Sequence, residues 1–324
     1  MAVNTAAARL TVSAINQFEK EVYDSISDYF QEVEYLRSNG RIKFNSAGPS
    51  IEWPLQTNRG AVAAFNREAR TDYTPVNPGV RLTLSNKGYK TADLVHMTDI
   101  WECAGPQQII DIMENRTQWQ PESIQRALAT EMFIGDGSTD NGYGTNGIIG
   151  FDNSILTTGT YAGQNVATET AVKGQVLSGA PYNAFSTDPL NALSQGILAC
   201  ERGTQAGGAN MYPDAIWLNY TNYAQLLNSI EAKRRVVDDG DSEKTGKRGT
   251  LKHMGVTIYR SRFVPASKGY ITNSKFLDVR CPTPKLLMPF KQEIGSPWSI
   301  GLMTIFYGLF RNIVPRAHAR MALA

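Results

Sequence analysis

Apolar residues recur at helical spacing in two long segments of the chain. Residues 10–38 place apolar side chains three or four positions apart, and Asn39-Gly40 then suits a left-handed helix end. Residues 106–134 show the same periodicity, so both segments are predicted to be helices. Pro121 lies inside the second segment, and a kink or a break is predicted there because proline lacks the backbone N–H of a helix interior.

Alternation of apolar and polar residues predicts strands between these two helices. Residues 50–58 predict a strand that Pro54 places at a sheet edge, and residues 80–98 predict one or two more strands. The polar stretch Arg59–Gly79 joins them, so the pattern predicts a long hairpin with a charged tip. An isolated hairpin is only marginally stable in water, and this one is therefore expected to lie on a neighbouring molecule.

The second half of the chain mixes shorter elements. A Gly/Asn-rich loop is expected over 135–150, and residues 157–187 read as loop with short strands. The remaining predicted elements are helices at 189–202 and 220–234, and strands at 215–219, 254–264, 269–273, 276–280 and 300–323. Helices and strands intermix without a regular βαβ rhythm, which favours the α+β class. The apolar run 300–310 is shorter than the roughly 20 residues that a membrane helix needs.

The amino-acid composition narrows the range of possible functions. With 324 residues, 42% of them hydrophobic, the chain can bury the core of one large domain or of two intimate ones. Its 32 basic and 30 acidic residues give a formal charge of +2, far less than expected of a protein that binds nucleic acid strongly through its phosphates. Three cysteines, Cys103, Cys200 and Cys281, lie far apart, which fits a reducing cytoplasm better than a disulfide framework.

Several motifs resemble cofactor-, phosphate- or metal-binding sites but lack residues or surroundings that such sites require. Gly142–Gly147 fits G-x-G-x-x-G, but it follows a predicted helix and precedes an apolar, strand-like run at Ile148–Phe151, the reverse of a dinucleotide fold. Residues 240–248 have the wrong glycine spacing for a phosphate loop, and Arg248 replaces the required Ser or Thr. Asp136, Ser138 and Asp140 lack the glycine and glutamate of a calcium loop, and the three histidines share no metal-ligand spacing. We therefore predict no catalytic residue, cofactor or metal ion, and no enzyme.

The order of several segments resembles a known family. The segment Ala127–Gly137 (ALATEMFIGDG) ends the second long helix and is followed by Gly147–Gly150 (GIIG). Then come Ala215–Asn219 with a helix behind it, Met254–Ile258 with Phe263-Val264-Pro265, and Asn312–Leu323. In this order the chain resembles the major capsid proteins of tailed bacteriophages, which have the Hong Kong 97-like fold. The resemblance covers about residues 45–324.

The resemblance implies a domain organisation and a function. It implies an N-terminal arm or helix over 1–49, an extended hairpin called the E-loop over 50–90, a P-domain with a spine helix over 91–160 and 263–324, and an A-domain over 161–262. It further implies a structural protein of the virion that assembles in the host cytoplasm. Copies of the chain would form the pentamers and hexamers of an icosahedral head that encloses double-stranded DNA.

The resemblance also assigns two intersubunit segments. The E-loop is expected to contact a neighbouring subunit through Arg59, Arg67, Glu68, Arg70 and Asp72. The loop at the five- and six-fold axes is expected to contain Arg234, Arg235, Asp238, Asp239, Asp241, Glu243, Lys244, Lys247 and Arg248. Because this loop carries both signs of charge, identical copies around an axis need not repel one another.

The remaining partner predictions follow from the resemblance and the composition. Only about 45 residues precede the hairpin, so a separate scaffolding protein is expected, together with a portal and room for a decoration protein. Contacts with packaged DNA should be weak and nonspecific, and no membrane contact is expected. Two alternatives stay open. One is an encapsulin-like cellular shell, which packaged cargo enzyme rather than DNA would reveal. The other is a soluble enzyme with a phosphate in the Gly-rich loop, which a nucleotide-binding assay would reveal.

Overall fold

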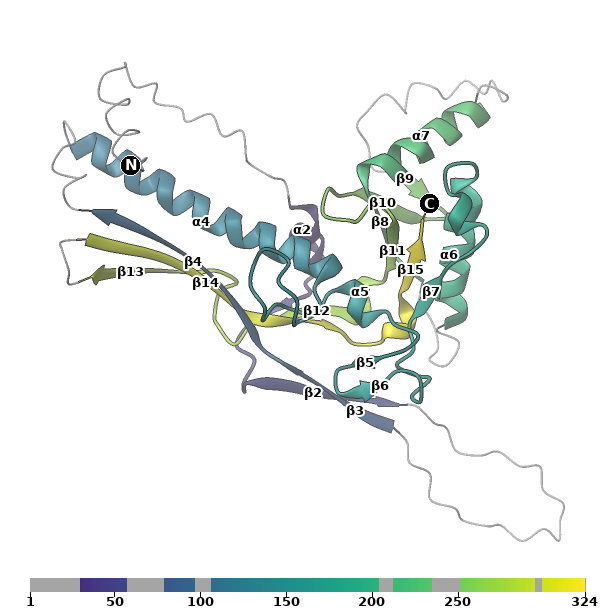
Figure 1. The fold of residues 1–324 in the computed structure, drawn as a ribbon, viewed down its shortest axis with the longest axis horizontal. Coiled ribbons are helices and arrows are strands. Elements are labelled where there is room, and N and C mark those ends of the chain that lie inside the picture. The colour runs from purple at the N-terminus through teal and green to yellow at the C-terminus, as the bar shows by residue number, and fades with distance from the viewer. Residues whose placement is uncertain are drawn as a thin grey trace, which may run out of the picture.

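A 29-residue helix, α4 (Pro106–Ile134), lies along one face of a sheet and dominates one side of the molecule (Figure 1). The computed structural model describes residues 30–56, 79–96, 106–203, 212–234, 251–294 and 299–323. α4 is continuous through Pro121, so the predicted break is wrong. The Gln120 amide holds the helix at this point, because its Nε2 donates to the carbonyl of Leu302 at 3.1 Å and its Oε1 accepts from Thr304 at 2.9 Å.

The sheet beneath α4 has five strands and is built around β14. Its strands are β1 (Ile42–Lys43), β4 (Lys87–His96), β12 (Leu277–Arg280), β13 (Met288–Ile294) and β14 (Ser299–Asn312). The first part of β14 pairs with β4 on one side and β13 on the other, and its last part pairs with β12. The short helix α2 (Gln31–Ser38) packs on the same core through Tyr35 and Leu36.

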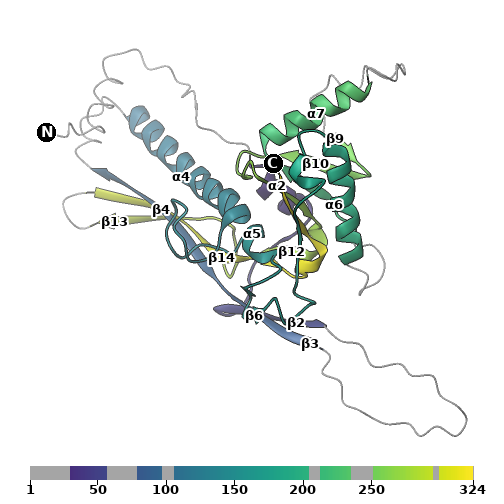
Figure 2. The same ribbon diagram turned by 45° about the vertical axis from the view of Figure 1, so that its right-hand side comes forward.

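A second lobe contains a six-stranded sheet with two helices (Figures 1 and 2). In sheet order its strands are β7 (Gln175–Leu177), β15 (Ala319–Ala322), β11 (Lys268–Thr272), β8 (Ala215–Leu218), β10 (Val256–Arg260) and β9 (Leu251–His253). The helices are α6 (Pro189–Gly203) and α7 (Tyr220–Arg234).

The central strand β8 connects the two cores. All four of its residues are buried, and they alternate between the cores. Ala215 and Trp217 pack with α4 residues such as Phe133, whereas Ile216 and Leu218 pack with the core of the second lobe. A strand that is apolar at every position is expected where both sheet faces are covered.

The predicted hairpin consists of β2 (Ser50–Gln56) and β3 (Gly79–Ser85), which pair with each other in a sheet of their own. A second small hairpin, β5 (Thr160–Tyr161) and β6 (Gln164–Asn165), lies against it, and the two share a third apolar cluster. The remaining short helices are α5 (Phe151–Ser154), η1 (Tyr182–Ala184), η3 (Ser274–Phe276) and η4 (Pro315–Ala317).

Most predicted elements are confirmed within the described residues, with three strands missed. α2 agrees with the end of the predicted helix 10–38, whose first 20 residues lie outside the described part. The strands β1, β9 and β13 were not predicted. At Phe151, where a strand-like run was expected, the short helix α5 begins instead. None of the described helices is both long and apolar enough to cross a membrane.

Candidate functional site: a polar junction and candidate contact surfaces

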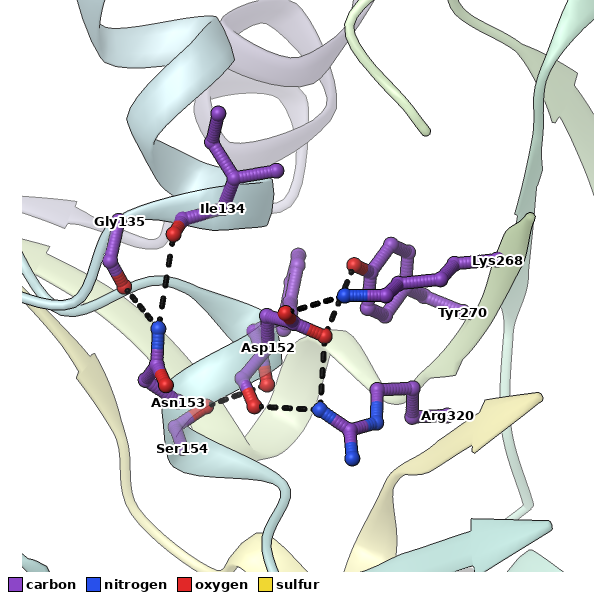
Figure 3. A network of polar contacts seen from close by, with 9 residues as sticks. Ile134, Gly135, Asp152, Asn153, Ser154, Lys268, Tyr270 and Arg320 are labelled. Carbon is purple, nitrogen blue, oxygen red and sulfur yellow. Dashed lines mark hydrogen bonds and ion pairs between the residues drawn. The ribbon is translucent and has the colours of Figure 1, made fainter. Parts of the chain in front are cut away.

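A cluster of polar side chains joins the end of α4 to the six-stranded sheet (Figure 3). The carboxylate of Asp152 in α5 accepts hydrogen bonds from Lys268 Nζ at 2.5 Å and from Arg320 Nη1 at 2.7 Å. The same Arg320 nitrogen donates to the backbone carbonyl of Asp152 at 2.9 Å, and the Tyr270 hydroxyl lies 3.4 Å from the carboxylate. One acid therefore binds two basic residues, and α5 is tied to both β11 and β15.

The opposite side of α5 is anchored to the end of α4. Asn153 Nδ2 donates to the carbonyl of Gly135 at 3.0 Å, and the Gly150 N–H donates to the same carbonyl at 2.8 Å. The Lys268 side chain is 33% exposed, so water screens its ion pair, and each exposed pair of this kind stabilises a fold by about 1 kcal/mol or less. The main effect of this polar junction is geometric, because it fixes the second lobe relative to α4.

Burial changes the ionisation of Tyr270 in the junction. Desolvation, and next the negative charge of Asp152, raise the pKa of Tyr270, so its hydroxyl stays protonated and can donate to the carboxylate. The junction contains an acid and two bases, but none of these groups faces a described cavity. It is an arrangement that positions parts of the fold, and we assign it no chemical reaction.

A buried carboxylate explains the glycines that follow α4. Glu131 is 1% exposed, and its Oε1 accepts a hydrogen bond from Asn141 Nδ2 at 3.0 Å. Desolvation raises the pKa of Glu131. A Cβ at either Gly135 or Gly147 would lie 2.6 Å from Glu131 Oε2. Gly147 is the last glycine of the G-x-G-x-x-G run, so the absence of its side chain makes room for the Glu131 carboxyl group and not for a phosphate.

The acidic residues of the same loop bind their own backbone. The Asp136 carboxylate accepts hydrogen bonds from the Thr139 hydroxyl and from the N–H groups of Thr139 and Ser138, the last two at 2.6 and 2.8 Å. These bonds, that of the hydroxyl first, lower the pKa of Asp136 to about 2. Asp140 accepts from the N–H groups of Gly142 and Gly144 at 2.8 and 2.9 Å. Among the residues that the structure describes, no group of His, Cys, Asp or Glu is placed to hold a metal ion.

The residues predicted for intersubunit contacts lie almost entirely outside the described residues. This holds for the E-loop residues Arg59, Arg67, Glu68, Arg70 and Asp72. It also holds for the axial-loop residues Arg235, Asp238, Asp239, Asp241, Glu243, Lys244, Lys247 and Arg248. Arg234 is the last residue of α7. The structure does describe the elements that carry these loops, which are β2 and β3 for the first and α7 and β9 for the second.

One candidate contact surface was not predicted. On the face of the five-stranded sheet that α4 leaves uncovered, Leu94, Phe290 and Tyr307 are exposed by 39%, 42% and 39%. The strand registers place these three side chains on the same face, opposite to Phe306, which is buried under α4. The sequence of β14 could have predicted this surface, because β14 is apolar at successive positions. Such a pattern is typical of strands that are covered on both faces.

Solved structures of shell proteins share this fold over nearly the whole chain. A chain of the cyanophage A-1(L) capsid asymmetric unit is 16% identical with a TM-score of 0.67, covering 97% of this chain and 98% of that one. The capsid of a native GTA particle gives 14% identity and a TM-score of 0.66 over both complete chains. The SrpI encapsulin complex from Synechococcus elongatus PCC 7942 gives 13% identity and a TM-score of 0.58, covering 99% and 96%.

No protein-family model and no curated protein sequence matches the chain. Identities of this size establish the fold and not the detailed chemistry. The likeness nevertheless covers 97% and 100% of this chain in the first two of these structures. The chain therefore has the α+β fold of the Hong Kong 97-like capsid proteins of tailed bacteriophages.

Proposed function

We propose that this protein is the major capsid protein of a tailed bacteriophage, and that its copies form the pentamers and hexamers of an icosahedral head around double-stranded DNA. The observation that carries the proposal is the likeness to capsid chains over nearly the full length. The capsids of four named phages give TM-scores from 0.56 to 0.67. In the family that the sequence resembles, such chains are structural subunits of the virion and not enzymes.

The surfaces of the chain support self-association. The apolar face that contains Leu94, Phe290 and Tyr307 is open to water in the single chain, and contiguous apolar patches on soluble proteins commonly mark interaction sites. The β2–β3 hairpin has one face in the third apolar cluster and a polar outer face with an exposed Glu52–Arg81 ion pair. A subunit with these two features gains buried area by associating with copies of itself.

The proposed roles of the two loops belong to this function. In the proposal, the E-loop residues between β2 and β3 lie on a neighbouring subunit, and the mixed-charge loop between α7 and β9 surrounds the five- and six-fold axes. The division into an N-terminal arm, E-loop, P-domain and A-domain belongs to the proposal as well. So do a separate scaffolding protein, a portal, and weak nonspecific contacts with DNA, which the net charge of +2 suits.

Electron microscopy of assembled particles tests the proposal. The full chain should be expressed with and without the candidate scaffolding protein of its own genome, and particles should be purified by sedimentation. Closed shells with five- and six-fold capsomers are expected. A chain that stays dispersed under every assembly condition, with its scaffold supplied, would contradict the proposal.

An encapsulin-like compartment is the second candidate, because an encapsulin shares the fold at a TM-score of 0.58. The contents of the particles separate the two functions. Nuclease-protected double-stranded DNA in particles from infected or induced cells supports the phage head. A packaged enzyme without protected DNA supports the cellular shell.

A further inference from the structure

The β2–β3 hairpin forms no strand ladder with any other described part of the fold. Its two strands pair with each other, and the chain enters the five-stranded sheet only after Asn86. In Figure 2 the hairpin lies at the lower edge of the molecule, next to β6. Besides its continuation into β4 and its packing in the third apolar cluster, individual polar contacts are therefore left to set its direction.

Trp53 of β2 makes two such contacts with the end of β14. Its indole N–H donates to the carbonyl of Ile313 at 3.1 Å, and the guanidinium of Arg311 lies 5.0 Å from the centroid of its ring. Trp53 is 6% exposed and Arg311 is 5% exposed. A guanidinium over an indole is a favourable cation–π arrangement, and it is stronger where water is excluded.

Arg311 is itself held in one orientation. Its Nε and Nη2 donate to the two carboxylate oxygens of Asp278 at 2.8 and 2.5 Å, and Asp278 is 1% exposed. Arg280 Nε donates to the same carboxylate at 3.1 Å. A bidentate pair between a guanidinium and a carboxylate allows few orientations. The plane that Trp53 contacts is therefore fixed by β12 and β14.

The other strand of the hairpin is supported by the small β5–β6 hairpin. The Thr83 N–H donates to the carbonyl of Ala162 at 3.0 Å, and Gln164 Nε2 donates to the carbonyl of Arg81 at 2.8 Å. These bonds hold β3, whereas Trp53 holds β2. The body of the molecule therefore contacts each strand of the hairpin separately.

We propose that Trp53 is a positioning residue for shell assembly, and that with Arg311 it forms a clamp that fixes the direction of the β2–β3 hairpin. The inference rests on the proposed function, in which the hairpin contacts a neighbouring copy. β2 has seven residues and so spans about 23 Å, and a rotation of about 10° at its base would move its far end by about 4 Å. A displacement of that size breaks hydrogen bonds across an interface without unfolding the subunit.

Spin-label distances in the dispersed full chain test the clamp directly. Labels are placed at the exposed positions Thr83→Cys on β3 and Ser123→Cys on α4, with Cys103→Ser in all variants. The parent should give a narrow distance distribution. Trp53→Leu, which keeps an apolar side chain but loses the ring and its N–H, should give a wider or shifted one. Arg311→Lys, which keeps the charge but loses the planar group, should do the same.

Two control variants separate the clamp from general loss of packing or charge. Ile51→Val trims another buried side chain of β2 in the same apolar cluster, and Arg280→Gln removes the other ion pair of Asp278. Both should keep the parental distribution. Parental distributions in Trp53→Leu and Arg311→Lys, or equal widening in the controls, would overturn the clamp. Should Trp53→Leu lack a cooperative unfolding transition, Arg311→Lys decides the outcome.

Electron microscopy of the same unlabelled variants tests the consequence for assembly. Trp53→Leu and Arg311→Lys should lose most regular shells while their subunits still unfold cooperatively, and both controls should assemble like the parent. Regular shells in full yield from clamp variants with widened distances would overturn the role in assembly. If the parent itself forms no shells, the proposed function fails, and the distance measurement still decides on the clamp.

Discussion

His318 lies fully buried between η4 and β15. Its role could be predicted from the sequence, but its burial could not. Its Nδ1 accepts a hydrogen bond from the Asn273 N–H at 3.2 Å, so the neutral ring carries its proton on Nε2. The absence of ligand spacing was enough to predict an ordinary histidine. Its burial was not predictable, because the partner lies 45 positions away in sequence. Burial lowers the pKa of His318 to about 3.

The stability of dispersed subunits should therefore fall in acid. Between about pH 6.5 and pH 3 the unfolded chain binds a proton at His318 that the folded chain does not, so folding is favoured above this window and weakened as the pH falls through it. One such group changes the free energy of unfolding by at most about 1.4 kcal/mol per pH unit. Urea unfolding at several pH values measures the slope. His318→Gln should reduce it, while His96→Gln, at an exposed position, should not; equal slopes in all three proteins would exclude His318 as the cause.

Gly150 shows a requirement that its sequence motif did not explain. It follows the loop after α4, and a Cβ there would lie 2.7 Å from the carbonyl oxygen of Met132 and even closer to that of Glu131. These are backbone atoms of a long helix, so they cannot move aside as a flexible side chain can. The resemblance had singled out the GIIG segment, but the reason for its last glycine is a close approach of two backbones.

Gly150→Ala should lower the free energy of unfolding by about 2 kcal/mol or more, because the overlap forces the loop away from α4. Chemical denaturation of dispersed subunits measures the change. Gly88→Ala is the matched control, since a Cβ at Gly88 meets its first neighbour at an ordinary 3.4 Å. An equal, small effect of both substitutions would show that the loop relaxes freely.

Among the elements, periodicity identified the helices better than the strands. α4 was predicted over its whole length, since a long amphipathic pattern is unambiguous. β13 was missed because Met288–Ile294 contains a proline and several polar residues and resembles a loop, yet its pairing with β14 supplies the hydrogen bonds of a strand. The break expected at Pro121 was wrong because buried residues on the following turns, such as Ile124 and Leu128, hold the helix against its sheet.

Pro121 should still weaken α4, because it leaves the carbonyl four residues earlier without its helical donor. Pro121→Ala is expected to raise the free energy of unfolding by about 1 to 3 kcal/mol. Thermal and urea unfolding of dispersed subunits measure it, with Glu122→Ala as the control for a change of helix propensity at the next position. A lower stability of Pro121→Ala would mean that the proline adapts the helix to the curvature of the sheet.

For the whole molecule, the sequence supplied the fold class and the order of elements, while the contacts that join the parts emerged only in three dimensions. The hairpin was predicted from the alternation of apolar and polar residues and from the polar stretch that joins the two strands. Its attachment through Trp53 to Ile313 spans 260 positions and leaves no local signal. The polar junction is similar, because Asp152, Lys268 and Arg320 come from three distant segments. The intersubunit loops stay predictions.

Asp152→Asn should loosen the second lobe relative to α4, because Lys268 and Arg320 would then face each other without a counter-charge. The loss of global stability should be about 1 kcal/mol, since these groups are partly exposed. Faster amide hydrogen exchange is expected in α5 and at the adjoining ends of β11 and β15. Glu52→Gln, in the exposed pair with Arg81, is the control. Unchanged exchange in α5 would contradict a positioning role of the junction.

Because β15 lies inside the six-stranded sheet, this sheet cannot be completed until β15 has been synthesised. β15 comes after every other described element along the chain, yet it lies between β7 and β11. A nascent chain that has not reached Ala319 therefore leaves the edges of β7 and β11 unpaired with each other, and its second core lacks Ala319, Met321 and Leu323. Such edges pair readily with other chains. During translation on crowded polysomes, the emergence of β15 thus ends the period in which these two edges are open to neighbouring nascent chains.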